Sequence, residues 1–365
     1  MTYKHLSFVS LFAVAALSAS AQRNVENFNF GWQFHRGNID VAAINTSDGS
    51  WETINVPHDF QISQPWVAPA ANESEDNSDG ASNFKSRLSA RGFKEMGDGW
   101  YVKTYTPAAD MKGRRILLDF EGIMYVGDVY LNGKRIGGTD YGYLGFDIDV
   151  SKLLKYGQAN TIAVHASTSG PLNSRWYTGG GLYRDVKIVS TPADIYFVRH
   201  PLYVTTTDNH LVNLQVEVAN YTKQNNVKLQ TVVKDPQGNI VYDKTVDMPF
   251  NRKMRTNELK WETIDIANPK LWNCDTPNLY TATVRILDAN GKEKDCATTR
   301  FGIRTIEIGP DFGLKVNGSK VLLKGIANHH TLGALGAAAY PRAMEKRMKM
   351  LKDFGFNHIR TSHNP

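Results

Sequence analysis

The sequence predicts a mainly β, multidomain protein in which two β-sandwich units precede a single strand–helix–strand unit. Short runs that alternate apolar and polar residues recur from residue 22 to about residue 303, with no long amphipathic helix between them. Turn sequences such as Asn132-Gly133 and Asp235-Pro236 separate these runs, as is usual between antiparallel strands. Residues 321–365 change to a helical period flanked by two apolar runs, which indicates a different architecture there.

Residues 22–191 are expected to form the first unit. Strands are predicted at residues 101–105, 116–120, 126–131, 161–166 and 185–189. Asn132-Gly133 predicts a tight hairpin, because both central residues of such a turn take a positive φ. Strands this frequent indicate a β-sandwich or a jelly roll.

Residues 192–303 are expected to form the second unit. Clean alternation at residues 211–218, 227–233 and 280–287 predicts half-buried strands. About seven strands in roughly a hundred residues is typical of an immunoglobulin-like sandwich. Nothing in this unit indicates chemistry, so we expect it to serve in spacing and packing.

Residues 304–365 are expected to form a βαβ unit. Pro341 suits the first turn of a helix, and Gly355 suits its left-handed C-cap. Helical spacing predicts one face that packs into a core and an opposite basic face. The predicted core face comprises Met344, Met348, Leu351 and Phe354, and the predicted basic face Lys346, Arg347, Lys349 and Lys352. Glu345 lies on this helix and is interpreted as a solvated charge.

Two polar clusters follow the two strands of this unit. His329 and His330 come after the first apolar run, and His363 and Asn364 come after the second. A βαβ unit makes its two strands parallel, so both clusters are expected at the same edge of the sheet. In a (β/α) barrel that edge is the face where catalysis takes place.

The same residues carry a family resemblance. Residues 357–365, Asn-His-Ile-Arg-Thr-Ser-His-Asn-Pro, resemble the first signature of family 2 glycoside hydrolases, the group of β-galactosidases, β-glucuronidases and β-mannosidases. Asn364 stands where tyrosine is common, which is similar to a branch of bacterial β-galactosidases. Residues 324–330 and 332–338 resemble the family's first strand and that same branch. Thr331 replaces an expected aspartate, which puts a charged role there in doubt.

The resemblance extends to the first two units. Residues 56–60, 99–101, 129–133 and 174–186 are similar to the sugar-binding jelly-roll domain of the family, and residues 269–280 to its second domain. The implied fold is therefore a jelly-roll sandwich, an immunoglobulin-like sandwich and the start of a TIM barrel. A complete barrel needs about 250 residues, so residues 304–365 are expected to hold only its first βαβ unit.

The resemblance also implies roles for particular residues. Arg360 would orient a catalytic carboxylate and keep it ionised, while His329, His363 and Asn364 would contact sugar hydroxyls, with His330 beside them. The acid/base and nucleophile are glutamates on the fourth and seventh barrel strands of the family, so no catalytic carboxylate is expected in this chain. Each histidine is alternatively a buried structural group.

The glycine-rich segment of the first unit is a second candidate sugar contact. Arg175 and Trp176 offer a fork of donors and a flat ring just before three consecutive glycines. A loop that packs the first unit against its neighbour explains the same pattern equally well. His58 and Asp59 are expected to hold the fold.

Residues 1–21 are typical of a secretory signal peptide. Lys4 precedes an almost wholly apolar stretch that is too short to span a bilayer, and Ala19-Ser20-Ala21 suits a cleavage site. No later stretch is long and apolar enough for a membrane span. The expected location is therefore periplasmic or secreted. Cys274 and Cys296 form one disulfide or remain two thiols in such a compartment.

Composition and motifs exclude several function classes. The net charge is +6, but Lys and Arg are scattered among 36 acidic residues, which argues against nucleic-acid binding. His329-His330 lacks the spacing of a helical zinc site, and no serine-hydrolase or nucleotide-binding loop occurs. No cofactor is required by this interpretation, although Na⁺ or Mg²⁺ assists some relatives. The expected partner is a carbohydrate, and a homo-oligomer is left open.

The function implied by the resemblance is that of an exported, retaining glycoside hydrolase of the β-galactosidase type. Such an enzyme would cleave terminal β-D-galactosyl residues, and the 365-residue chain alone is expected to be inactive. A β-glucuronidase or β-mannosidase is the alternative within the family. A non-catalytic carbohydrate-binding fragment is the alternative from another class.

Overall fold

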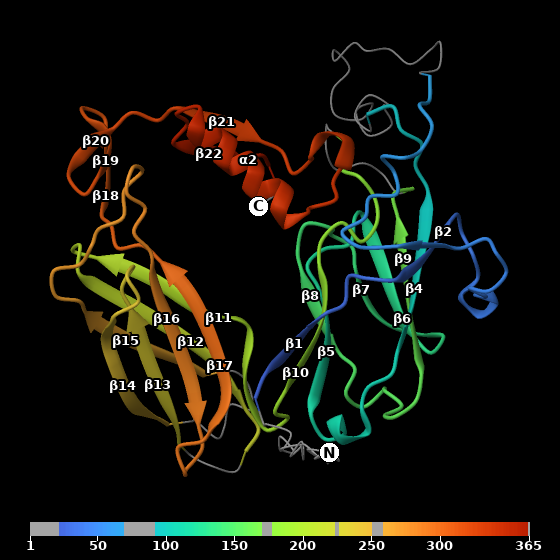
Figure 1. Ribbon diagram of the computed structural model, residues 1–365, viewed down its shortest axis with the longest axis horizontal. Coiled ribbons are helices and arrows are strands. Elements are labelled where there is room, and N and C mark those ends of the chain that lie inside the picture. Colours follow the sequence, from blue (N-terminus) through green and yellow to red (C-terminus); the bar gives the residue numbers. More distant parts are fainter. Residues whose placement is uncertain (1–21, 69–91, 170–176, 223–225, 250–257, 364–365) are drawn as a thin grey trace, which may run out of the picture.

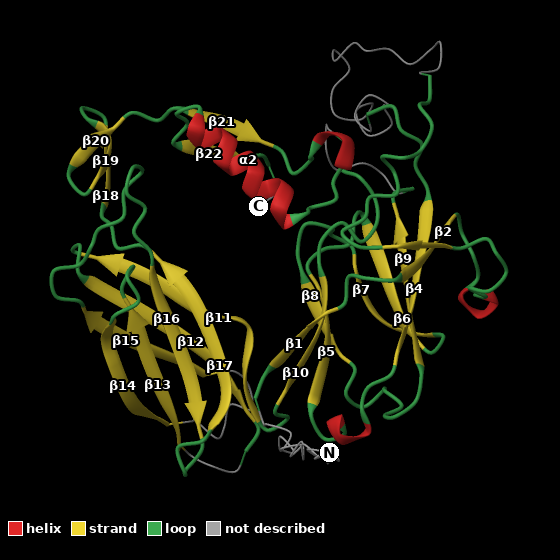
Figure 2. Ribbon diagram, viewed as in Figure 1, coloured by secondary structure: helices red, strands yellow, loops and turns green. Residues whose placement is uncertain are grey.

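The computed structural model describes residues 22–68, 92–169, 177–222, 226–249 and 258–363. It contains two β-sandwiches side by side, and the C-terminal segment lies across one end of both (Figure 1). Strands dominate and helices are few (Figure 2). The mainly β fold class is thus confirmed.

The first sandwich consists of a four-stranded and a six-stranded antiparallel sheet. The four-stranded sheet has the order β1 (Asn24–Asn27), β10 (Val186–Thr191), β5 (Arg115–Phe120), β8 (Phe146–Asp149). The six-stranded sheet has the order β3 (Glu52–Ile54), β2 (Trp32–Arg36), β4 (Asp98–Tyr105), β9 (Asn160–Ser167), β6 (Val126–Leu131), β7 (Lys134–Thr139). Between the sheets lies an aromatic and aliphatic core that includes Trp32, Phe60, Tyr101, Ile116 and Phe120.

Local sequence explains the hairpin between β6 and β7. Asn132 and Gly133 have φ values of 51° and 80°, the conformation that a tight two-residue hairpin requires. Short 3₁₀ turns lie at Val41–Ala43 (η1) and Ala109–Met111 (η4).

The second sandwich packs a three-stranded sheet on a four-stranded one. The orders are β11 (Ile195–Thr207), β12 (Leu211–Asn220), β15 (Glu258–Asp265) and β14 (Ile240–Pro249), β13 (Asn226–Lys234), β16 (Tyr280–Leu287), β17 (Glu293–Phe301). Alternate residues of β12, Val212, Leu214, Val216 and Val218, are buried between the sheets, as the sequence pattern predicts.

A small antiparallel sheet leads from the second sandwich to the C-terminal unit. It consists of β18 (Ile306–Gly309), β19 (Gly313–Val316) and β20 (Ser319–Val321). Strand β21 (Gly325–Asn328), the 3₁₀ turn η5 (Gly333–Leu335), helix α2 (Pro341–Asp353) and strand β22 (His358–Thr361) follow. Strands β21 and β22 pair in parallel, so the predicted βαβ unit is confirmed.

The apolar face of α2 is less buried than the sequence suggests. Met344, Met348 and Leu351 are only partly buried, and Phe354 is 79% exposed. The prediction that Phe354 belongs to a core is therefore wrong for this chain. Phe354 is the C-cap residue beyond the last helical turn, and among the described residues only β21 and β22 pair in the sheet beneath this helix.

Candidate active-site segment

The parallel pairing of β21 and β22 brings the two polar clusters together. Gly325 is opposite His358 and Asn328 is opposite Thr361 in the strand register. Both strands run in the same direction, so the residues that follow Asn328 and Thr361 emerge at one edge of the sheet. The amide of Ser362 donates to the carbonyl oxygen of Asn328 at 3.0 Å, which joins the two strand ends directly.

Arg360, His363 and His329 lie in contact at this edge. The Arg360 guanidinium Nη2 is 3.3 Å from His363 Nδ1, and the imidazole rings of His329 and His363 meet edge to face at 5.3 Å between centroids. A guanidinium only donates hydrogen bonds, so this contact makes His363 Nδ1 the acceptor and places the ring proton on Nε2. The group presents a fixed positive charge beside two imidazoles.

Ser362 is the buried anchor of this group. Only 5% of Ser362 is exposed, whereas Arg360 and His363 on either side of it are exposed. Arg360 Nη1 lies 3.4 Å from Ser362 Oγ, and the Ser362–His363 peptide bond is cis. The buried serine anchors the strand end, and the candidate side chains Arg360 and His363 remain accessible.

Arg347 of α2 fixes the loop that carries His329. Its guanidinium donates to Asn328 Oδ1 at 2.9 Å, to the carbonyl oxygen of His329 at 3.2 Å and to that of Thr331. The sequence places Arg347 on the face opposite the methionines, and the structure gives it this bracing role in addition. The sequence held no signal for this role, because the acceptors are mostly backbone carbonyls 16 to 19 residues earlier.

His330 points in a different direction from His329. Its Nε2 is 3.0 Å from the carbonyl oxygen of Thr178, and its ring lies edge-on to Tyr143 and Tyr183 of the first sandwich. Burial is the main cause that lowers the pKa of His330, so the imidazole is neutral near pH 7 and donates from Nε2 to the carbonyl. The structure therefore places His330 in the contact between the first sandwich and the C-terminal unit.

Asp59 joins the same two parts of the molecule. Its buried carboxylate accepts hydrogen bonds from the amides of Gln61 and Gly180, from the Tyr177 hydroxyl at 2.7 Å, and from the Ala337 amide at 2.7 Å. A side chain on Gly179 would place its Cβ 2.5 Å from Ala337. The glycine run thus permits a close approach of two backbones that Asp59 then ties together.

His58 and Asp59 both hold the fold, as predicted. His58 Nδ1 is 2.9 Å from the Tyr101 hydroxyl, and burial lowers the pKa of His58 to about 4. Asp59 does more than was predicted, because its bond to Ala337 spans 278 residues of sequence. The nearby Tyr177 phenol is held neutral, since burial and the adjacent Asp59 carboxylate raise its pKa.

Several predicted features lie outside the described residues. These are the candidate sugar contacts Arg175, Trp176 and Asn364 and the signal-like residues 1–21. Glu345 is exposed and pairs with Arg342, as a solvated charge should.

Neither strand end supplies a carboxylate. The sequence has no Asp or Glu in residues 325–340 or 358–365. Within the described ranges, no three His, Cys, Asp or Glu side chains gather in a way that could hold a metal ion. Cys274 and Cys296 are both free thiols. No helix among the described residues is long and apolar enough to cross a membrane.

The chain matches three family models in succession. Residues 89–174 match the "Glycosyl hydrolase 2 galactose-binding domain-like" model, residues 197–304 "Glycosyl hydrolases family 2", and residues 310–365 "Glycosyl hydrolases family 2, TIM barrel domain". The first segment lies within the first sandwich, and the other two correspond to the second sandwich and the C-terminal unit. This chain belongs to glycoside hydrolase family 2.

Particular relatives are similar along nearly the whole chain. Beta-galactosidase BoGH2A of Bacteroides ovatus is 31% identical over 97% of this chain and 40% of its own length. A beta-glucuronidase of Formosa agariphila is 29% identical over 94% of this chain and 36% of its own length. The crystal structure of a family 2 member from Bacteroides cellulosilyticus superimposes with a TM-score of 0.80 at 32% identity, covering 93% of this chain and 43% of that one. The chain thus spans about two fifths of these relatives.

Proposed function

We propose that this chain is the N-terminal portion of a retaining glycoside hydrolase of the β-galactosidase type. The supporting observation is the contact of Arg360 with His363, and of His363 with His329, at the carboxyl ends of two parallel strands. That edge is where barrel enzymes bind their substrates. A cation beside two imidazoles suits a substrate rich in hydroxyls and a reaction that uses carboxylates.

Retaining glycosidases need two carboxyl groups about 5 to 5.5 Å apart. Neither strand end here provides one, so in this proposal both come from later strands of a complete barrel. Arg360 would hydrogen-bond the nucleophilic carboxylate, holding its orientation and favouring its ionised form through a nearby fixed charge. The nucleophile would form a glycosyl–enzyme intermediate, which water then releases with the second carboxyl acting first as acid and then as base.

The histidines would recognise the sugar. A neutral imidazole offers one donor and one acceptor, and His363, whose Nδ1 accepts from Arg360, keeps its Nε2–H as a donor for a sugar hydroxyl. His329 and His363 face each other at the open edge, so both can contact the same sugar, and Asn364 would extend this set. His330 Nε2 already donates to the carbonyl oxygen of Thr178, so His330 would shape the wall of the pocket rather than bind a hydroxyl group. Arg175 and Trp176 remain candidate contacts from the first sandwich.

A galactoside is the favoured substrate for two reasons. BoGH2A matches 97% of the chain, and Asn364 with residues 332–338 resembles a galactosidase branch of the family. The β-glucuronidase alternative is supported by relatives of that name at similar identity. A β-mannosidase and a non-catalytic carbohydrate-binding fragment are the remaining alternatives.

The signal-like residues 1–21 support a periplasmic or secreted location. We propose a carbohydrate as the only required partner, with no organic cofactor, and leave a homo-oligomer and an activating Na⁺ or Mg²⁺ open.

A panel of chromogenic glycosides tests the proposal. The full-length gene product should hydrolyse a p-nitrophenyl β-galactoside faster than the β-glucuronide and β-mannoside, and the 365-residue chain should hydrolyse none. Faster turnover of the glucuronide or the mannoside would transfer the proposal to that alternative. No turnover by the full-length product on any of the three would contradict the enzyme assignment, and turnover by the 365-residue chain would contradict the placement of the carboxylates.

A further inference from the structure

A groove of about 1070 Å³ lies where the first sandwich meets the second. It runs beside η4, which lies in Figure 1 next to the N label, at the end of the first sandwich remote from α2. The groove is slightly larger than most small-ligand sites, so it can take several linked sugar rings rather than one. Neither the family signature nor the candidate active-site segment includes any residue of this groove.

The second sandwich supplies an aromatic platform to the groove. Tyr196 of β11 and Tyr221, just after β12, stack with ring centroids 6.0 Å apart and planes 28° from parallel. Tyr196 is buried, whereas Tyr221 is 59% exposed and covers it. The Tyr221 backbone amide donates to the carbonyl oxygen of Asp194 at 2.7 Å, which holds the backbone that carries the exposed ring. An exposed, supported ring face is the usual partner for the C–H face of a sugar.

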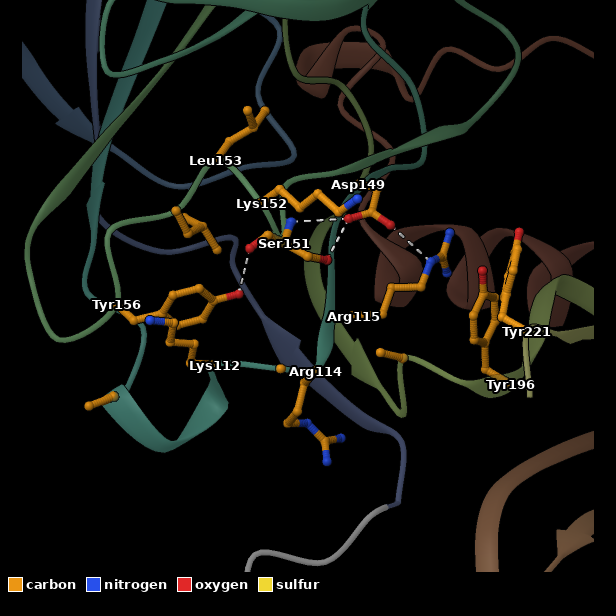
Figure 3. Close-up of a pocket in the computed structure, with 14 residues that line it drawn as sticks. Lys112, Arg114, Arg115, Asp149, Ser151, Lys152, Leu153, Tyr156, Tyr196 and Tyr221 are labelled. Atoms are coloured by element: carbon orange, nitrogen blue, oxygen red, sulfur yellow. Dashed lines mark hydrogen bonds and ion pairs between the residues drawn. The ribbon is translucent and has the colours of Figure 1, made fainter. Parts of the chain in front are cut away.

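The first sandwich supplies positive charge. The lining contains the four cations Lys112, Arg114, Arg115 and Lys152, and one carboxylate, Asp149. Arg115 lies between the two features: its guanidinium carbon is 4.3 Å from the centre of the Tyr196 ring, and its Nε is 3.1 Å from Asp149 Oδ2 (Figure 3).

Asp149 is fixed by its neighbours, so it positions Arg115 without cancelling the other cations. It accepts hydrogen bonds from the amide and hydroxyl of Ser151, whose carbonyl oxygen accepts from Tyr156 (Figure 3). Lys112 and Lys152 are exposed, and within the described part of the chain neither forms an ion pair. The groove therefore keeps an excess of positive charge beside a stacking surface.

We propose that this groove binds an acidic oligosaccharide, a chain of sugars that bear carboxylate or sulfate groups. Sugar rings would stack on Tyr221, and the acidic groups would pair with Lys112, Lys152 and the outer face of Arg115. Guanidinium and ammonium groups bind such anions by charge-assisted hydrogen bonds. A neutral glycan would use the ring alone, so the cations select for acidic sugars. The groove holds a glycan chain independently of any hydrolysis at the strand ends.

Calorimetric titration of the full 365-residue chain tests this inference. The probes are trigalacturonic acid, a sulfated galactose trisaccharide and neutral galactotriose, each at about 50 mM salt. Saturable binding of at least one acidic probe is expected, with a Kd about tenfold or more below that of the neutral probe. Raising the salt to about 0.5 M should weaken it, since the cations are exposed.

Two groove variants and one control locate the site. Tyr221→Ala should weaken binding about fivefold through loss of stacking, and Lys152→Glu about tenfold through charge reversal. Lys134→Glu, an exposed residue of β7 outside the groove, makes the same charge change and should leave the Kd within about twofold. Unchanged melting curves would show that all three fold. The inference is overturned if neither acidic probe binds, if galactotriose binds equally well, or if the groove variants bind like the control.

Discussion

Replacing Asp59 by Asn should loosen the contact between the first sandwich and the C-terminal unit. The carboxylate accepts four hydrogen bonds, from Gln61, Tyr177, Gly180 and Ala337. An Asn side chain keeps one acceptor oxygen, which can serve the Gln61 and Gly180 amides. Its NH₂ group then faces the Ala337 amide, and because both groups are donors this hydrogen bond is lost. The Tyr177 hydroxyl can rotate and accept a hydrogen bond from the same NH₂ group.

The magnitude follows from the bonds that are lost. A hydrogen bond to a charged acceptor contributes about 1.5 to 3 kcal/mol, and a buried donor left without an acceptor costs about 1 to 3 kcal/mol. Losing the bond to Ala337 and weakening the others should therefore cost about 3 kcal/mol in the local opening of this contact. Tyr177→Phe removes one donor and leaves the carboxylate, so it should cost about half as much.

Hydrogen exchange measured by mass spectrometry reads this opening directly. In Asp59→Asn, amides of residues 332–340 should exchange about a hundredfold faster, and those of β12 in the second sandwich should not change. Asp311→Asn, an exposed position, is the matched control and should leave the whole pattern as in the wild type. Protection of residues 332–340 that is equal in Asp59→Asn and Asp311→Asn would refute the role assigned to Asp59.

Three further predictions concern other contacts. Arg23→Met should destabilise the protein by about 3 kcal/mol in urea unfolding, because Asp295, which is 0% exposed, loses its bidentate partner. Arg135→Met breaks an exposed, solvent-screened pair and should leave the urea midpoint almost unchanged. Equal shifts of the midpoint in the two variants would contradict this prediction. His58 has a pKa of about 4 in the folded protein against 6.5 for the free side chain, so the unfolded chain binds the proton first as the pH falls. The free energy of unfolding should therefore decrease by up to about 3 kcal/mol between pH 6.5 and pH 4. His58→Gln should make this decrease shallower, and an unchanged pH dependence would contradict the prediction. Arg347→Met should lower kcat/KM of the full-length product about tenfold, because it releases the loop that carries His329. Lys349→Met, at an exposed position of the same helix, should leave kcat/KM unchanged. Equal kcat/KM values for the two variants would contradict the bracing role of Arg347.

Local pattern was enough to predict the elements of this fold. Strand β12 alternates apolar and polar residues and buries every second residue. Asn132-Gly133 forms the hairpin between β6 and β7, and α2 begins at Pro341. Each of these depends on residues a few positions apart, for which side-chain period and backbone preference decide the outcome. The parallel pairing that brings His329 next to His363 could also be predicted from the sequence, because the two strands of a βαβ unit run parallel and their carboxyl ends lie at the same edge.

The contacts that position the candidate site could not be predicted in this way. Asp59 reaches Ala337, His330 reaches Thr178, and Arg347 binds carbonyl oxygens of the loop after β21. Backbone acceptors carry no residue-type signal, and a bond across 278 residues depends on how whole units dock. The prediction that Phe354 is buried was wrong for a related reason: helical spacing shows which face of a helix is apolar but not what packs against that face.

The most direct test of the account is the turnover of a β-galactoside by the full-length gene product with Arg360 replaced by Met. Arg360 is exposed, so the variant should melt like the wild type, while kcat falls about a hundredfold or more because the nucleophilic carboxylate loses its fixed positive partner. Arg342→Met on α2, also exposed, should keep the wild-type kcat. A kcat for Arg360→Met within about threefold of the Arg342→Met value would contradict the assignment of this strand edge as the catalytic face.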